Sequence, residues 1–180
     1  MKAFFIWIAL FSLYTKSHAS SFLNSCYKES NAEVRHTILE LKKTVFTTNC
    51  QEAWTRLQKK TEIHLQNKGI VSLAPLKEFK NLRTLDVWGN NIRSLEGIEH
   101  LENLTQLWIG DNKVVSLAPL QGLKELKIFM AWDNNIQDLT PLQDLPLLEL
   151  EVGKNPIRIC PRKSFSKILS LTCQKNKKSA

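Results

Sequence analysis

The chain has 180 residues, of which 43% are hydrophobic and 8% aromatic, and it carries a formal net charge of +8. This apolar content is enough for the core of one domain and excludes an intrinsically disordered chain, while four cysteines are too few for a fold held by disulfides alone. The excess of 25 Lys and Arg over 17 Asp and Glu raises nucleic acid as a partner, so the position of these charges matters.

The amino-terminal segment, residues 1–19, has a lysine at position 2, an apolar run over residues 3–14, and small residues at Ser17 and Ala19. This pattern is typical of a secretory signal peptide cleaved after Ala19, and the run is shorter than the roughly 20 residues that span a bilayer. We therefore expect a secreted, periplasmic or extracellular protein with no transmembrane segment in the mature chain. A weaker alternative is lipoprotein processing at Cys26, which a polar stretch separates from the apolar run.

Two helices are predicted next. Apolar residues recur at helical spacing between Glu33 and Phe46, and a second helix is expected to begin at Thr48 or Asn49 and to contain Trp54. We expect Trp54 to lie in the core.

A repeat of about 22 residues follows. Its units read LRTLDVWGNNI at 82–92, LTQLWIGDNKV at 104–114, LKIFMAWDNNI at 126–136 and LLELEVGKNPI at 147–157, after a degenerate copy at 60–70. Apolar residues at the fourth and sixth positions predict a short strand with these side chains on one face. The asparagines at the ninth position, namely Asn90, Asn112, Asn134 and Asn155, are expected to bond backbone groups where the chain bends out of the strand.

The segments between these strands have apolar residues at every third position, which favours tight three-residue helical turns. Pro75, Pro119 and Pro141 lie in these segments and are compatible with such turns, but not with the interior of a sheet.

This pattern resembles the leucine-rich repeats of internalins and of a protein phosphatase regulator. The resemblance covers roughly residues 60–157 and implies an α/β fold, a right-handed curved solenoid with a parallel β-sheet on its concave side and short 3-10 turns on its convex side. It also implies a helical N-terminal cap over residues 20–59. Residues 158–180 are expected to form a C-terminal cap, with a short helix at 164–171, and a basic tail. Lys60 and Lys68 replace the leucine and asparagine of the first unit, as expected of a terminal repeat.

The cysteines fall in two pairs, one in each predicted cap. In a secreted chain this favours disulfides between Cys26 and Cys50 and between Cys160 and Cys173, with four free thiols as the alternative. The first pairing requires the chain to run back along the predicted helix. No spacing of Cys and His is typical of a zinc site.

The register predicts which side chains point away from the core on the concave face. The candidate partner-binding residues are Trp88, Trp108, Trp132, Met130, Asp86, Asp111, Asp133, Gly110, His64 and Glu151. Trp88 and Trp132 are expected about 10 Å apart with Gly110 between them, because neighbouring strands lie about 4.8 Å apart. Such a slot would accept an Arg, Lys or aromatic side chain of a partner.

No catalytic motif or cofactor signature occurs, so a non-enzymatic protein-binding module is the predicted function. Residues 60–157 hold 10 basic and 13 acidic side chains, whereas residues 158–180 hold seven basic and no acidic ones. This distribution favours a protein partner over nucleic acid. The alternatives are a binder of anionic polymers through the basic tail with Lys175, Lys177 and Lys178, and a secreted enzyme inhibitor or envelope structural component.

Overall fold

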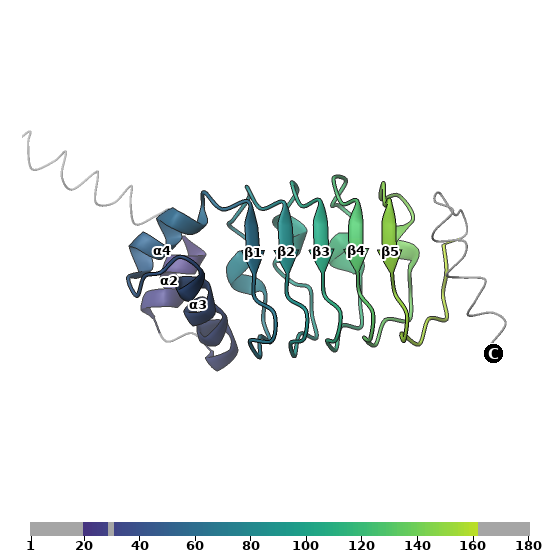
Figure 1. Ribbon diagram of the computed structural model, residues 1–180, viewed down its shortest axis with the longest axis horizontal. Helices are drawn as coiled ribbons and strands as arrows, with labels where there is room; N and C mark the ends of the chain where they lie inside the picture. The colour runs from purple at the N-terminus through teal and green to yellow at the C-terminus, as the bar shows by residue number, and fades with distance from the viewer. Residues whose placement is uncertain (1–19, 29–30, 162–180) are drawn as a thin grey trace, which may run out of the picture.

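The structure, a computed structural model, describes residues 20–28 and 31–161. Three helices, α2 (Ser21–Tyr27), α3 (Ala32–Thr44) and α4 (Cys50–Leu57), pack together at one end of a row of strands (Figure 1). The predicted signal peptide, the predicted helix at 164–171 and the basic tail lie outside the described residues.

The strands form one parallel sheet in chain order. They are β1 (Glu62–His64), β2 (Thr84–Asp86), β3 (Gln106–Trp108), β4 (Ile128–Met130) and β5 (Glu149–Glu151). The fourth positions of successive units pair directly, for example Leu85 with Leu107 and Leu107 with Phe129. The repeat register predicted from the sequence is therefore confirmed.

Short 3-10 helices return the chain between the strands, as the proline positions predict. They are η1 (Ala74–Leu76), η2 (Ile98–His100), η3 (Ala118–Leu120) and η4 (Thr140–Leu142), and three of them have proline in their first turn. The leucines of sheet and turns meet in one continuous core, which runs from Phe22 in the cap to Ile157 in the last repeat. The predicted solenoid is thus confirmed.

The ninth-position asparagines join neighbouring repeats through buried side-chain hydrogen bonds. The Oδ1 atom of Asn112 accepts from the backbone N–H of Ile92 at 3.0 Å, and its Nδ2 atom donates to the carbonyls of Val87 and Ile109 at 3.0 Å each. Asn90, Asn134 and Asn155 make the same kinds of bonds one repeat earlier or later. Each asparagine therefore satisfies backbone groups that the bend leaves without a strand partner.

The two predicted cap helices are present. Helix α3 begins after Asn31, whose side chain accepts from the N–H of Val34, and it ends at Thr44 rather than at Phe46. Helix α4 begins after Asn49, whose side chain accepts from the N–H of Glu52. Asparagine is a favourable residue before the first turn of a helix because it satisfies a free backbone N–H.

Helix α2 is not predicted by the sequence, and one carboxylate binds its amino-terminal end. Glu78, just after η1, accepts hydrogen bonds from the Ser20 hydroxyl, from the first backbone N–H groups of α2 and from the Trp54 indole. Burial raises the pKa of Glu78, but these hydrogen bonds lower it more, so the net shift is downward. Trp54 packs against the core, as predicted, but is only partly buried, and its indole N–H donates to this carboxylate.

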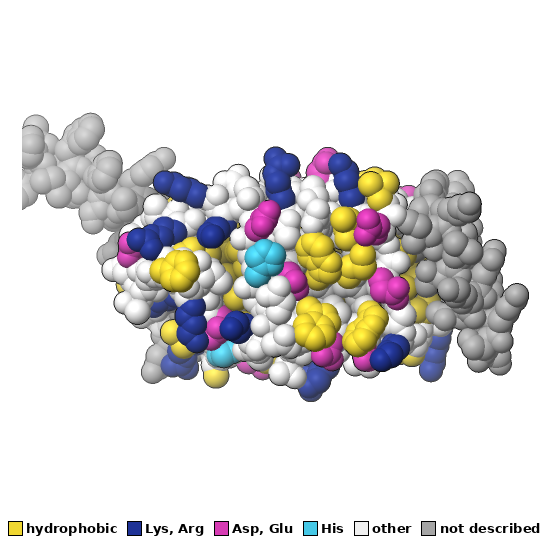
Figure 2. All heavy atoms as spheres, in the orientation of Figure 1, with side chains coloured by type: hydrophobic (Ala, Val, Ile, Leu, Met, Phe, Trp, Pro, Cys, Tyr) yellow, Lys and Arg dark blue, Asp and Glu magenta, His cyan; other side chains and the backbone are white. Residues whose placement is uncertain are grey.

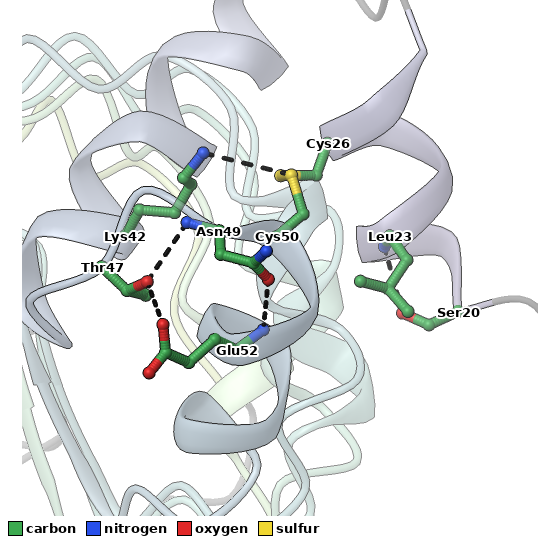
Figure 3. The surroundings of a disulfide bond; sticks show 8 residues. All are labelled: Ser20, Leu23, Cys26, Lys42, Thr47, Asn49, Cys50 and Glu52. Atoms are coloured by element: carbon green, nitrogen blue, oxygen red, sulfur yellow. Dashed lines mark hydrogen bonds between the residues drawn. A yellow bond between two sulfur atoms is a disulfide. The ribbon is translucent and has the colours of Figure 1, made fainter.

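A disulfide joins Cys26 of α2 to Cys50 of α4, with 6.0 Å between the Cα atoms (Figure 3). Helix α2 packs against both α3 and α4, so the first cysteine lies where the predicted pairing requires it. Because its sulfur is in this bond, Cys26 has no free thiol to carry lipid. Cys160 is also disulfide-bonded, but Cys173 lies outside the described residues, so the second pairing stays a prediction.

Candidate functional site

The alternation of the strands places the three repeat tryptophans on the concave face. Trp88 is 40% exposed, and Trp108 and Trp132 are half-buried, whereas the intervening Val87 and Ile109 are fully buried. A strand directs successive side chains to opposite faces, so the buried neighbours fix the outward direction of the indoles. The sequence prediction of outward tryptophans agrees with this geometry.

Residues at the eighth position have a left-handed backbone in every unit. Asn67, Gly89, Asp111, Asp133 and Lys154 have φ values of 55°, 68°, 52°, 54° and 55°. Asparagine, aspartate and glycine tolerate this conformation better than other residues. The left-handed backbone therefore explains why aspartate recurs at this position. Lys154 is the one residue here that is not of a favoured type.

The acidic residues at the fifth position hold the backbone of their own turns. Asp86 accepts from the backbone N–H of Trp88 at 3.1 Å and from the Gln66 side chain at 2.6 Å. Glu151 likewise accepts from the backbone N–H of Gly153 at 2.7 Å. These two carboxylates thus position the start of their own turns.

His64 stands at the same position on β1, away from the tryptophans. Its imidazole lies 3.7 Å from the carboxylate of Glu62, and both side chains are exposed. The structure thus places this candidate at the cap end of the concave face.

The slot predicted between Trp88 and Trp132 is not open. A Cβ atom at Gly110 would lie 2.8 Å from Cδ1 of Trp88 and 3.2 Å from its Nε1 atom, so this indole lies directly over Gly110. Because glycine has no side chain, the ring from the neighbouring strand packs onto its backbone and fills the space. Gly110 is the support of Trp88 and not the floor of a gap.

One face of the Trp132 indole is occupied by a cation of the same chain. Nζ of Lys154 lies 4.5 Å from the centroid of the Trp132 ring and 3.8 Å from the carboxylate of Asp133. A lysine over an indole face is a favourable cation–π arrangement. A partner cation would have to replace Lys154 here.

Hydrophobic side chains gather over β3 and β4 on the concave face, with acidic side chains around them (Figure 2). We call this group the aromatic patch, and it consists of Trp88, Trp108, Ile128, Met130 and Trp132. Ile128, at the third position of its unit, is half-buried beside Met130 and was missed among the sequence candidates. The signal was an apolar residue where the other units have Glu62, Thr84, Gln106 and Glu149.

The acidic candidates lie around this patch. Asp111 and Asp133 follow the carboxyl ends of β3 and β4, and Glu151 pairs with Met130 on the outermost strand. Within residues 20–28 and 31–161, no three His, Cys, Asp or Glu side chains are grouped so that they could hold a metal ion. Among the described helices, none is long and apolar enough to cross a membrane.

Comparisons with known proteins agree with this architecture. The family model described as "Leucine Rich repeats (2 copies)" matches residues 80–124. The internalin inlC2 of Listeria monocytogenes is 32% identical with a TM-score of 0.59, over 64% of this chain and 51% of that one. The internalin inlF of the same organism is 23% identical with a TM-score of 0.65, over 74% and 40%. A leucine-rich repeat protein of Leptospira interrogans is 18% identical with a TM-score of 0.52, over 69% and 37%.

The chain therefore spans about half or less of the length of these solved structures. A search of curated proteins found no match. The repeat sequence, the parallel sheet and the structural matches lead to one conclusion: the chain has a leucine-rich repeat fold similar to that of the solved internalins.

Proposed function

We propose that this chain is an exported, non-enzymatic module that binds a protein partner through the aromatic patch on its concave face. The observation that carries the proposal is the outward position of three tryptophans beside Met130 and Ile128 on one rigid sheet. Tryptophan is enriched among residues that dominate binding energy, because it offers a large apolar area with a polar tip.

The surroundings of the patch indicate the chemistry of the partner. Asp111, Asp133 and Glu151 lie around it, and the repeats hold 13 acidic against 10 basic side chains. Acidic groups around an apolar centre favour a partner whose own apolar contact residues are flanked by Lys or Arg. Because Trp88 already covers Gly110, the partner is expected to pack on the indole surfaces and not to insert between them.

Export is supported by the disulfide between Cys26 and Cys50, since such bonds persist in oxidising compartments and are rare in the cytosol. The signal-like segment at residues 1–19 is the sequence feature that agrees with it.

The test is affinity capture from surface or envelope proteins by the chain and by a variant with Trp88→Ala, Trp108→Ala and Trp132→Ala. A matched control is Val115→Ala, which removes apolar surface from a residue that is 53% exposed and lies outside the strands. The proposal requires a partner that the control retains and the triple variant loses. Equal capture by all three forms would make the proposed site wrong.

A further inference from the structure

The helical cap carries a second exposed apolar site, far along the molecule from the aromatic patch. The Phe46 side chain, in the loop between α3 and α4, is 91% exposed, which is the largest value among the exposed large hydrophobic residues described. Its backbone is in the left-handed region with φ of 53°. An aromatic residue is unfavourable in both respects, because its apolar surface meets water and its Cβ crowds the backbone.

The backbone conformation at Phe46 belongs to the end of helix α3. The N–H of Phe46 donates to the carbonyl of Lys43 at 3.2 Å, and that of Thr47 donates to Lys42 at 3.3 Å. These two bonds define the common helix ending in which glycine is the preferred residue at the left-handed position. Glycine would satisfy the fold at least as well, so the phenyl ring is not explained by stability.

Hydrogen bonds from neighbouring residues order the loop that carries Phe46. Arg56 of α4 donates to the carbonyl of Val45 at 2.6 Å and forms an ion pair with Glu52. The Thr47 hydroxyl donates to the same Glu52 carboxylate. A loop that is ordered before binding loses less conformational entropy when it binds than a mobile loop does.

The neighbouring surface is basic. On α3, Arg35 and Leu39 lie on the exposed side together with Lys43, whose side chain is 72% exposed, and Leu39 is 48% exposed. Leu39 is four residues from both Arg35 and Lys43, so these three side chains share one side of α3, and Phe46 follows the end of this helix. In Figure 2, Lys and Arg side chains gather around hydrophobic side chains on the cap.

The charge of the whole cap agrees with this local picture. Residues 20–59, the predicted cap, hold six Lys and Arg against four Glu. Two of these glutamates, Glu40 and Glu52, are paired with Lys43 and Arg56. The cap is thus the basic end of a molecule whose repeats are mildly acidic.

We propose that the exposed side of α3 and its loop form a membrane-surface site, at which Phe46 and Leu39 enter the interface of an anionic lipid bilayer. Arg35 and Lys43 then lie at the level of the lipid phosphates. An aromatic or aliphatic side chain flanked by Lys and Arg is the composition that binds anionic bilayer surfaces.

A bilayer is favoured over a protein partner by the shape of the site. Phe46 and Leu39 are separate exposed side chains with basic and polar neighbours, whereas the aromatic patch is a group of apolar side chains on one sheet, suited to a complementary protein surface. A lipid interface accepts an isolated side chain without a matching pocket. Because the cap is at one end of the row of strands (Figure 1), such contact leaves the concave face open.

The test measures co-sedimentation with vesicles of phosphatidylcholine alone and of phosphatidylcholine mixed with phosphatidylglycerol, using the predicted mature chain from Ser20. We expect binding to the anionic vesicles that salt weakens. Phe46→Gly should reduce this binding about tenfold or more, since it removes a whole aromatic side chain from the interface. Its thermal unfolding midpoint should be unchanged or higher, which excludes unfolding as the cause.

Two controls keep the result specific. Val115→Ala removes another exposed apolar side chain and should bind like the wild type. Lys177→Gln with Lys178→Gln removes charge from the basic tail and should weaken binding less than Phe46→Gly. The proposal is wrong if the wild-type chain ignores anionic vesicles, if Phe46→Gly binds them normally, or if only the tail variant loses binding. If Phe46→Gly lost a protein partner but still bound the vesicles, the site would belong to a protein and not to lipid.

Discussion

Replacement of Asn112 by alanine tests whether the buried asparagines hold the repeats together. The side chain is 8% exposed and bonds to Ile92, Val87 and Ile109. Alanine keeps the backbone conformation but removes every one of these bonds.

The expected loss in the free energy of unfolding depends on which hydrogen-bond partners each backbone group keeps. The carbonyl of Val87 still accepts from Asn90, and that of Ile109 still accepts from Asn134, so both keep a donor. The buried N–H of Ile92 loses the Asn112 oxygen. One buried donor left without its partner costs about 1–3 kcal/mol, and two weakened carbonyls add roughly 1 kcal/mol, which gives about 2–4 kcal/mol in total.

Urea unfolding followed by circular dichroism measures this free energy, with an unchanged dependence on denaturant showing that the folded state is intact. Asn155→Ala is the matched control, because that residue has the same bonds in the last repeat but is only half-buried. It should lose about half as much. A loss below about 1 kcal/mol for Asn112→Ala, or an equal loss for both variants, would refute the structural role of these asparagines.

Three further predictions follow from single contacts. Because hydrogen bonds lower the pKa of Glu78, the stability that its ionised carboxylate gives to the folded chain is fully present above about pH 5 and is lost as the pH falls through that lowered pKa. Glu78→Gln should remove this part of the acid sensitivity of the fold. An unchanged pH profile of the unfolding midpoint in this variant would contradict the prediction. Gly110→Ala should displace the Trp88 indole, because the new Cβ atom would lie 2.8 Å from its Cδ1 atom. This variant should change tryptophan fluorescence and weaken partner binding, and it should lose at most about 1 kcal/mol of stability. A normal emission spectrum would show that the contact is absent. Cys26→Ser with Cys50→Ser should cost about 3 kcal/mol, since the bond closes a loop with a sequence separation of 24 residues, and equal thermal stability with and without reductant in the wild type would argue against it.

The repeats could be predicted from the sequence because the same pattern occurs several times. Each copy of the leucine and asparagine positions checks the register of the others, so the outward direction of Trp108 follows from Leu107 and Ile109. The helical spacing of apolar residues before residue 47 similarly predicts α3, although the helix ends at Thr44 and not at Phe46.

Features that depend on contacts between distant residues could not be predicted in this way. Helix α2 has only seven residues and is held by distant contacts, such as the hydrogen bond between Ser21 and Glu78, which are 57 residues apart. The position of the Trp88 ring depends on a side-chain rotamer, which the repeat pattern does not specify. The contact of Lys154 with Trp132 also depends on side-chain rotamers. The predicted slot between Trp88 and Trp132 was therefore wrong.

The proposed function is tested most directly by the affinity of the captured partner for Trp108→Ala, measured by calorimetry. Trp108 is the most suitable tryptophan, because Trp88 is coupled to Gly110 and Trp132 to Lys154. We predict that affinity falls tenfold or more, a change of about 1.4 kcal/mol or greater, while the unfolding midpoint stays near that of the wild type. An unchanged affinity in a folded Trp108→Ala variant would contradict recognition through the concave face.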